Sequence, residues 1–188
     1  MSYIRARRVV GAAFAAGFLT LGCVTHTWAV QKPVLPYCLS SQLRLSAGPR
    51  VPEATQQNAL FLRLTNVSRA GCALRGYPRV ALSGRNGVPL RFTYRRGGDQ
   101  MLTSAPPARV WLRPGATAYL GINKQTCIAR QTVLARRIRV IPPGDRQPVA
   151  AVLPSYPELG YCGPGDPGYV IDISPVEPTM QAVYAHRA

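Results

Sequence analysis

Four cysteines are the residues of this 188-residue chain with the clearest chemistry. Cys38, Cys72, Cys127 and Cys162 form an even set, and no two of them lie within the two to four residues typical of zinc ligands. An even set favours two disulfides if the chain is exported, which its N-terminal residues predict. Three pairings are possible. We favour Cys38–Cys72 and Cys127–Cys162, each closing a loop of about 34 residues that stabilises the fold by about 3 to 4 kcal/mol.

Groups for acid–base or nucleophilic catalysis are scarce. The chain has two histidines, His26 and His186, and its seven acidic residues are scattered singly, mostly in turns. A Ser/His/Asp triad needs a base held rigidly beside its nucleophile, and carboxylate catalysis needs two acids in one site. Asp172, between two isoleucines, is expected to face solvent or pair with an arginine. We therefore predict a protein that is not an enzyme and holds no cofactor or metal.

Basic residues outnumber acidic residues by 23 to 7, and 21 of the 23 are arginines. The only lysines are Lys32 and Lys124. Without Arg5, Arg7 and Arg8, which precede the apolar start of the chain, 20 basic residues remain and the formal charge is +13. A genome rich in G and C explains such a bias by codon use. Attraction to a polyanion explains it as function, and in an exported chain that partner is an envelope polymer or a lipid headgroup rather than nucleic acid.

Five of the arginines fall on polar positions of expected strands, where a period of two directs side chains away from the core. They are Arg91, Arg95, Arg96, Arg137 and Arg139. If their strands are neighbours, these side chains form a basic face that could bind an anion. The alternative is a solvated sheet surface that discourages edge-to-edge aggregation.

Short strands must position these side chains. The chain contains 17 glycines and 18 prolines, and most prolines end apolar runs, as expected for strands joined by tight turns. Apolar and polar residues alternate in about nine segments, among them 60–65 and 137–141, and no helical period is sustained. The sequence predicts an all-β fold, an antiparallel β-sandwich.

Residues 1–29 form a predicted secretory signal, because a basic start precedes an apolar run at 9–21 and Thr27-Trp-Ala29 fits a cleavage site. The alternative is a lipoprotein signal ending in Cys23, whose acylation would anchor the chain to a membrane. No later run is long enough for a transmembrane helix. We expect an extended leader at 30–37, one disulfide-stapled domain at 38–176, and a tail at 177–188 that is disordered or a frayed helix.

Several strings resemble a known family. They are Cys38 followed by Leu-Arg-Leu at 43–45, Leu-Arg-Leu-Thr-Asn-Val-Ser at 62–68, Cys-Ala-Leu-Arg-Gly-Tyr-Pro at 72–78, Leu-Arg-Pro-Gly-Ala-Thr-Ala at 112–118, Cys127, Ile-Arg-Val-Ile-Pro-Pro-Gly at 138–144, and Cys162. Together they resemble the bacterial secreted domain of unknown function 4232. The resemblance implies an exported or lipid-anchored β-sandwich of immunoglobulin-like character, and it implies no activity and no binding residue.

Two function classes remain open. The protein could be a binding module for an anionic component of the bacterial cell envelope, which the charge favours. It could instead be a structural or accessory subunit that binds another exported protein through a sheet edge or loops. The sequence indicates no oligomeric state.

Overall fold

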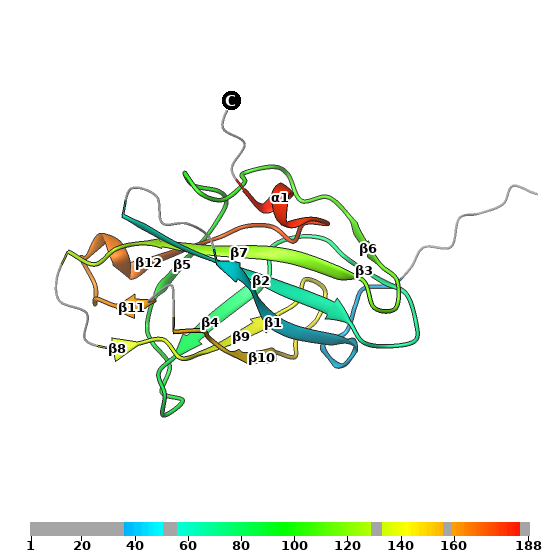
Figure 1. The fold of residues 1–188 in the computed structure, drawn as a ribbon, viewed down its shortest axis with the longest axis horizontal. Coiled ribbons are helices and arrows are strands. Elements are labelled where there is room, and N and C mark those ends of the chain that lie inside the picture. Colours follow the sequence, from blue (N-terminus) through cyan, green and yellow to red (C-terminus); the bar gives the residue numbers. More distant parts are fainter. Residues whose placement is uncertain (1–35, 51–55, 129–132, 156–158, 185–188) are drawn as a thin grey trace, which may run out of the picture. The chain divides into compact units, whose positions relative to one another are not determined.

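Strands of 2 to 10 residues, joined by turns and longer loops, form the framework of the fold (Figure 1). The computed structural model describes residues 36–50, 56–128, 133–155 and 159–184; the predicted signal, Cys23 and most of the leader lie outside them. The strands are β1 (Leu43–Arg50), β2 (Gln57–Asn66), β3 (Cys72–Leu74), β4 (Arg79–Ser83), β5 (Thr93–Arg96), β6 (Val110–Leu112), β7 (Thr117–Gln125), β8 (Val133–Leu134), β9 (Arg137–Ile141), β10 (Val149–Val152), β11 (Gly160–Tyr161) and β12 (Val170–Ile173). The helical elements are η1 (Ser40–Gln42), η2 (Pro167–Tyr169) and α1 (Met180–Val183). The all-β prediction is confirmed, with twelve strands in the described residues rather than about nine.

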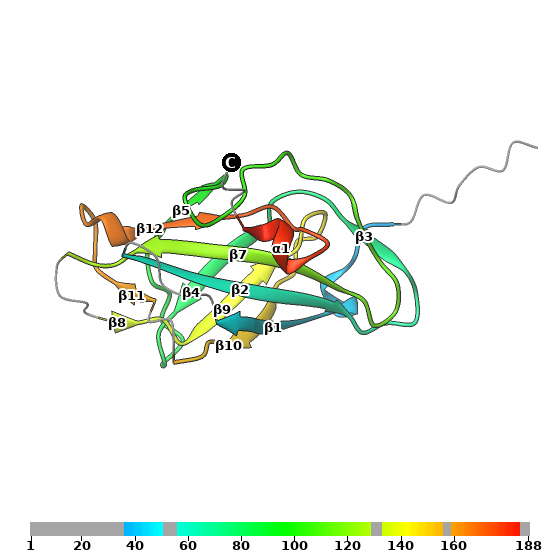
Figure 2. The ribbon, with the colours of Figure 1, turned by 45° about the horizontal axis from the view of Figure 1, so that its top comes forward.

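Two sheets carry most of the structure. One has five strands in the order β1-β2-β7-β12-β5, and the other has three in the order β10-β9-β4; the pairs β11-β8 and β3-β6 are separate. Neighbouring strands are antiparallel except β5, which pairs parallel with β12. Figures 1 and 2 show the three-stranded sheet beneath the five-stranded one, so the two form the layers of a sandwich.

The main hydrophobic core lies between these layers because alternation turns every second side chain inward. From the five-stranded sheet it takes Leu60, Leu62 and Leu64 of β2 together with apolar residues of β1, β7 and β12. From the three-stranded sheet it takes Val80 and Leu82 of β4 and Ile138 and Val140 of β9. The core therefore leaves the alternate residues of β4 and β9 pointing out of the sandwich.

A second, smaller core covers the opposite face of the five-stranded sheet. Alternation predicts that Phe61 faces outward, but its side chain is fully buried beneath Leu102 and α1, and its ring meets that of Tyr184 at 4.6 Å. A side chain at Gly121 would collide with Leu102 and Val183, so this glycine lets α1 pack. The C-terminal segment, expected as a disordered tail or frayed helix, forms the short helix α1 and packs against the sheet as far as Tyr184.

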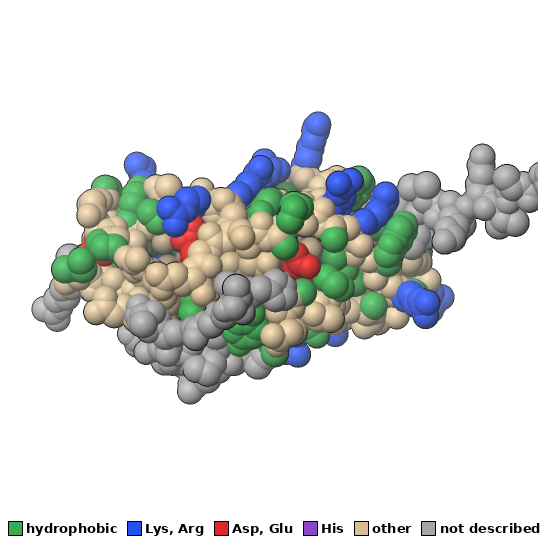
Figure 3. Space-filling view, turned by 90° about the horizontal axis from the view of Figure 1, so that it is seen from above, with side chains coloured by type: hydrophobic (Ala, Val, Ile, Leu, Met, Phe, Trp, Pro, Cys, Tyr) green, Lys and Arg blue, Asp and Glu red, His purple; other side chains and the backbone are tan. Residues whose placement is uncertain are grey.

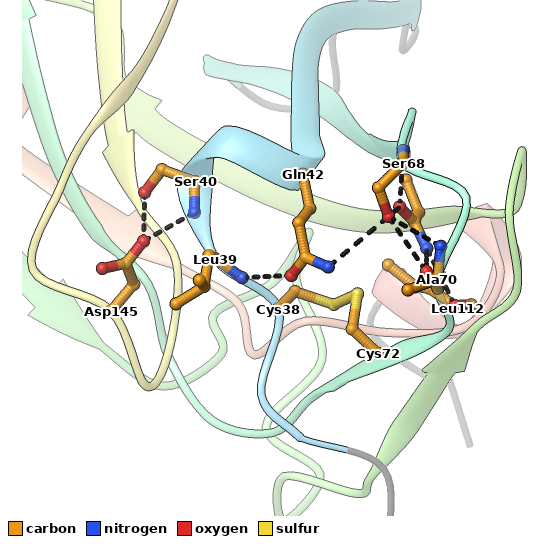
Figure 4. The surroundings of a disulfide bond; sticks show 10 residues. Cys38, Leu39, Ser40, Gln42, Ser68, Ala70, Cys72, Leu112 and Asp145 are labelled. Carbon is orange, nitrogen blue, oxygen red and sulfur yellow. Dashed lines mark hydrogen bonds between the residues drawn. A yellow bond between two sulfur atoms is a disulfide. The ribbon is translucent and has the colours of Figure 1, made fainter.

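The structure pairs the cysteines as favoured, Cys38 with Cys72 and Cys127 with Cys162, with Cα–Cα distances of 4.9 and 5.7 Å. Figure 4 shows the first pair beside η1, where Ser40 donates to the carboxylate of Asp145 from both its backbone N–H and its hydroxyl. These hydrogen bonds lower the pKa of Asp145 well below its usual range. They tie the start of the domain to the turn between β9 and β10.

Two disulfides indicate an oxidising, extracellular environment. No helix in the described part of the chain is long and apolar enough to cross a membrane.

Candidate functional site

The outer face of the three-stranded sheet brings arginines together. β9 alternates strictly, with Ile138 and Val140 buried and Arg137 and Arg139 exposed. β4 starts on Arg79, which is exposed directly before the buried Val80. The prediction that Arg137 and Arg139 point away from the core is therefore confirmed. The same alternation places Arg79 on the outer face, although the sequence alone did not lead us to expect it there.

The register places three small residues and the exposed Val152 beside these arginines. Arg139 lies between Ala81 of β4 and Ala150 of β10. Arg137 lies between Ser83 of β4 and Val152 of β10. Alternate residues along a strand are roughly 7 Å apart, so Arg137 and Arg139 leave the strand side by side on the same face.

Three open depressions follow one another along this face. The first, of about 290 Å³, has Arg79 and Arg139 in its lining, and Arg139 also lines the second, of about 400 Å³. Arg137 lines the second and the third, of about 510 Å³, where it is joined by Arg85 and Arg136. We call this row the basic groove and define it by Arg79, Arg85, Arg136, Arg137 and Arg139.

The charge of the basic groove is not neutralised locally. Within the described residues, none that lines the three depressions is acidic. The one ion pair among the described residues, Arg95–Asp172, lies outside these three depressions. Unpaired guanidinium groups in a shallow groove attract anions and can bind carboxylates or phosphates in a bidentate manner.

The remaining predicted arginines do not join the basic groove. Arg95 and Arg96 belong to β5, at the edge of the five-stranded sheet, and Arg91 precedes that strand. The condition for a single basic face, that the strands carrying these arginines are neighbours, is therefore not met for β5 and β9. Arg95 also has a partner: its Nε and Nη2 donate to the two oxygens of Asp172 at 2.5 and 2.9 Å, the arginine pair expected for this acid.

A polar depression of about 560 Å³ surrounds this ion pair. Burial raises the pKa of Asp172, with nearby Asp99 adding to the effect and Arg95 opposing it. Asp99 is held by the N–H groups of Met101 and Leu102. Figure 3 looks onto the side of the molecule that carries β5, β12 and α1, and it shows few acidic side chains among many basic ones.

The sequence did not predict the environment of one charged side chain. Lys124, at the end of β7, is only 1% exposed, and burial lowers its pKa to about 8. Its Nζ lies 3.7 Å from Sγ of Cys127 and 3.9 Å from Sγ of Cys162. The available signal was a rare lysine three residues before a cysteine in a chain that otherwise uses arginine.

Groups for catalysis or metal binding are limited in the described residues. Both histidines, His26 and His186, lie outside them. The one potential metal cluster in the described part is Cys127, Cys162 and Asp166, whose two sulfurs are bonded to each other.

Comparisons with known proteins give one match. A family model described as "Domain of unknown function (DUF4232)" matches residues 38–176. Neither the comparison with curated proteins nor the comparison with solved structures gave a match.

Proposed function

Because the chain belongs to the family of the domain of unknown function (DUF4232), whose description names no activity, we propose a function from its own surface chemistry. We propose that the protein is an exported, non-catalytic module that binds a linear acidic polymer of the cell envelope along the basic groove. The observation that carries the proposal is the row of three depressions joined by Arg139 and Arg137, with no acid among the described lining residues.

An extended ligand fits this surface better than a small one. The three depressions are open and adjoin one another, so none encloses a compact molecule on its own. Three of the four flanking residues, Ala81, Ser83 and Ala150, are short, and the fourth, Val152, is itself exposed. A polymer with an acidic group on each repeat could contact several arginines in succession and release counterions from each contact.

A bilayer surface fits less well. Proteins that dock on membranes place tryptophan and tyrosine at the interface beside their basic residues. The described residues that line the basic groove include no aromatic side chain. We therefore favour a carboxylated or sulfated polysaccharide over a phospholipid headgroup.

The test is binding to polygalacturonate, with neutral dextran and anionic phosphatidylglycerol vesicles as comparison probes. The protein should bind polygalacturonate at low salt and not dextran. Arg137→Gln with Arg139→Gln should weaken that binding about tenfold, since each exposed charge contact contributes up to about 1 kcal/mol.

Arg91→Gln with Arg96→Gln is the matched control, because it removes the same charge from exposed arginines outside the basic groove. It should weaken binding less than about twofold. Equal losses in both double variants would show that net charge, rather than the basic groove, drives binding. Tighter binding to vesicles than to polygalacturonate would show that the ligand is a lipid headgroup and not a polymer.

A second candidate function, an accessory subunit for another exported protein, is favoured by a different surface. Trp111 and Tyr37 are 51% and 43% exposed, and both rings lie against the guanidinium group of Arg109, at 4.9 and 5.6 Å. Exposed tryptophan, tyrosine and arginine are the side chains that most often anchor protein interfaces. Trp111→Ala would abolish recovery of a stoichiometric partner under this function and leave polygalacturonate binding unchanged.

A further inference from the structure

The two disulfides have different surroundings. Cys38 and Cys72 are fully buried in the main core, whereas Cys127 and Cys162 are both partly exposed near one end of the five-stranded sheet. Thiol–disulfide exchange requires an attacking thiolate to reach a sulfur atom. Cys127–Cys162 is therefore the more exposed of the two disulfides in the folded protein, and Cys38–Cys72 becomes accessible only when the core opens.

A buried lysine lies against the accessible disulfide. The ammonium group of Lys124 is within 4 Å of both sulfurs and donates to the carbonyl oxygen of Gln125 at 2.6 Å. Within the described residues it forms no ion pair within 4 Å, although Asp166, whose carboxylate lies within 4.8 Å of both sulfurs, attracts it. Burial outweighs that attraction and lowers the pKa of Lys124, so the position of this lysine is costly.

Reduction of the disulfide would place a second negative charge, besides the nearby carboxylate of Asp166, next to Lys124. Asp166 disfavours a thiolate at this place, and Lys124 offsets that repulsion. A cysteine thiolate released at either sulfur would be directly beside the ammonium group. A neighbouring cation lowers the pKa of a thiol, makes its thiolate a better leaving group and favours the reduced state. Lysine suits this role while it is protonated, because its ammonium group is a compact charge on a flexible stem and can lie close to a released thiolate.

The surrounding backbone would hold a reduced pair together. The carbonyl oxygen of Gly160 lies 3.6 Å from both sulfurs and could accept a hydrogen bond from the cysteine that keeps its proton. The carboxylate of Asp166 accepts hydrogen bonds from the N–H groups of Ile128 and Gly168, at 3.0 and 2.8 Å, and so links the segments that carry the two cysteines.

We propose that the Cys127–Cys162 disulfide is a thiol–disulfide exchange site for an exported dithiol, and that Lys124 stabilises the thiolate that leaves. The partner's thiolate attacks one sulfur, forms a mixed disulfide and releases the other cysteine as a thiolate beside Lys124. The partner's second thiol then attacks the mixed disulfide. Two electrons and two protons pass to this chain, and the partner leaves with its own disulfide. This activity is independent of the proposed polymer binding.

The test uses dithiothreitol as the dithiol under native conditions at pH 7, followed by alkylation and peptide mapping of each cysteine. In the wild-type protein, Cys127–Cys162 should open at least about 100-fold faster than Cys38–Cys72, which serves as an internal control for unfolding. Lys124→Met should slow this opening about tenfold. It should also make the disulfide about tenfold harder to reduce at equilibrium, which corresponds to about 30 mV.

A pH series separates this role from a purely structural one. The rate advantage of the wild-type protein over Lys124→Met should shrink as the pH rises past about 8, because the buried lysine then loses its proton, while the Cys38–Cys72 rates stay equal in the two proteins. Opening of both wild-type disulfides at one common rate would overturn the proposal, and this measurement uses the wild-type protein alone. Equal Cys127–Cys162 rates in the two proteins at pH 7 would also overturn it.

Discussion

Replacing Lys124 with methionine should change how the stability of the folded protein depends on pH. The side chain is 1% exposed, and burial lowers its pKa from 10.5 to about 8. Methionine has a similar length and carries no charge, so it can occupy the same space beside the Cys127–Cys162 disulfide. The perturbation therefore removes the titrating group and keeps most of the packing.

The magnitude follows from the difference between the two pKa values. Between pH 8 and pH 10.5 the unfolded chain holds a proton that folded Lys124 has released, so wild-type stability rises with pH in this window. The free-energy cost of burying the charged Lys124 is largest below pH 8 and disappears above pH 10.5. Relative to Lys124→Met, the wild-type free energy of unfolding should increase by about 2.5 kcal/mol from pH 7 to pH 10.

The assay is guanidinium unfolding followed by circular dichroism, with both disulfides intact, at pH 7 and pH 10. The quantity compared is the difference in free energy of unfolding between the two proteins, and how much it changes from pH 7 to pH 10. The contributions of tyrosines, of other titrating groups and of the lost hydrogen bond to Gln125 cancel in this comparison. A difference that stays constant within about 0.5 kcal/mol would show that Lys124 titrates normally, and the argument from its burial would fail.

Three further changes test the fold. Ser40→Ala should destabilise the protein by about 1 kcal/mol at pH 7 in thermal unfolding. That loss should shrink between pH 4 and pH 2, since the depressed pKa of Asp145 stabilises the fold above pH 4 and less as the carboxylate gains a proton; a pH-independent loss would contradict it. Gly121→Val should cost about 1 to 3 kcal/mol by overpacking against α1, and unchanged resistance of the C-terminal segment to proteolysis would refute this contact. Replacing Cys38 and Cys72 with alanine should lower stability by about 4 kcal/mol or more in denaturant unfolding, and a loss below 1 kcal/mol would rule out their role as a core staple.

Local patterns explain what could be predicted from the sequence. The alternation of Arg137, Ile138, Arg139 and Val140 determines which side chains face out of the sandwich, because a strand has a period of two wherever one face is buried. The favoured cysteine pairing also matches the structure, since each pair staples a local section of the chain.

Long-range arrangement explains what could not be predicted. β9 pairs with β4 and β10, whereas β5 pairs with β12, so Arg95 and Arg137 lie in different sheets. No local pattern encodes these neighbours, because sequence separation leaves many pairings open. The burial of Phe61 likewise depends on the C-terminal helix, and the burial of Lys124 depends on residues about 40 positions further along the chain.

The salt dependence of polygalacturonate binding tests the central claim, the basic groove, most directly. The affinity of the wild-type protein should fall linearly on a plot of log affinity against log salt concentration, because binding releases counterions. Removing Arg137 and Arg139 should make that slope shallower by roughly 1 to 2, whereas removing Arg91 and Arg96 should leave it unchanged. Equal slopes for the wild-type protein and the Arg137/Arg139 variant would contradict the assignment of the basic groove as the binding site.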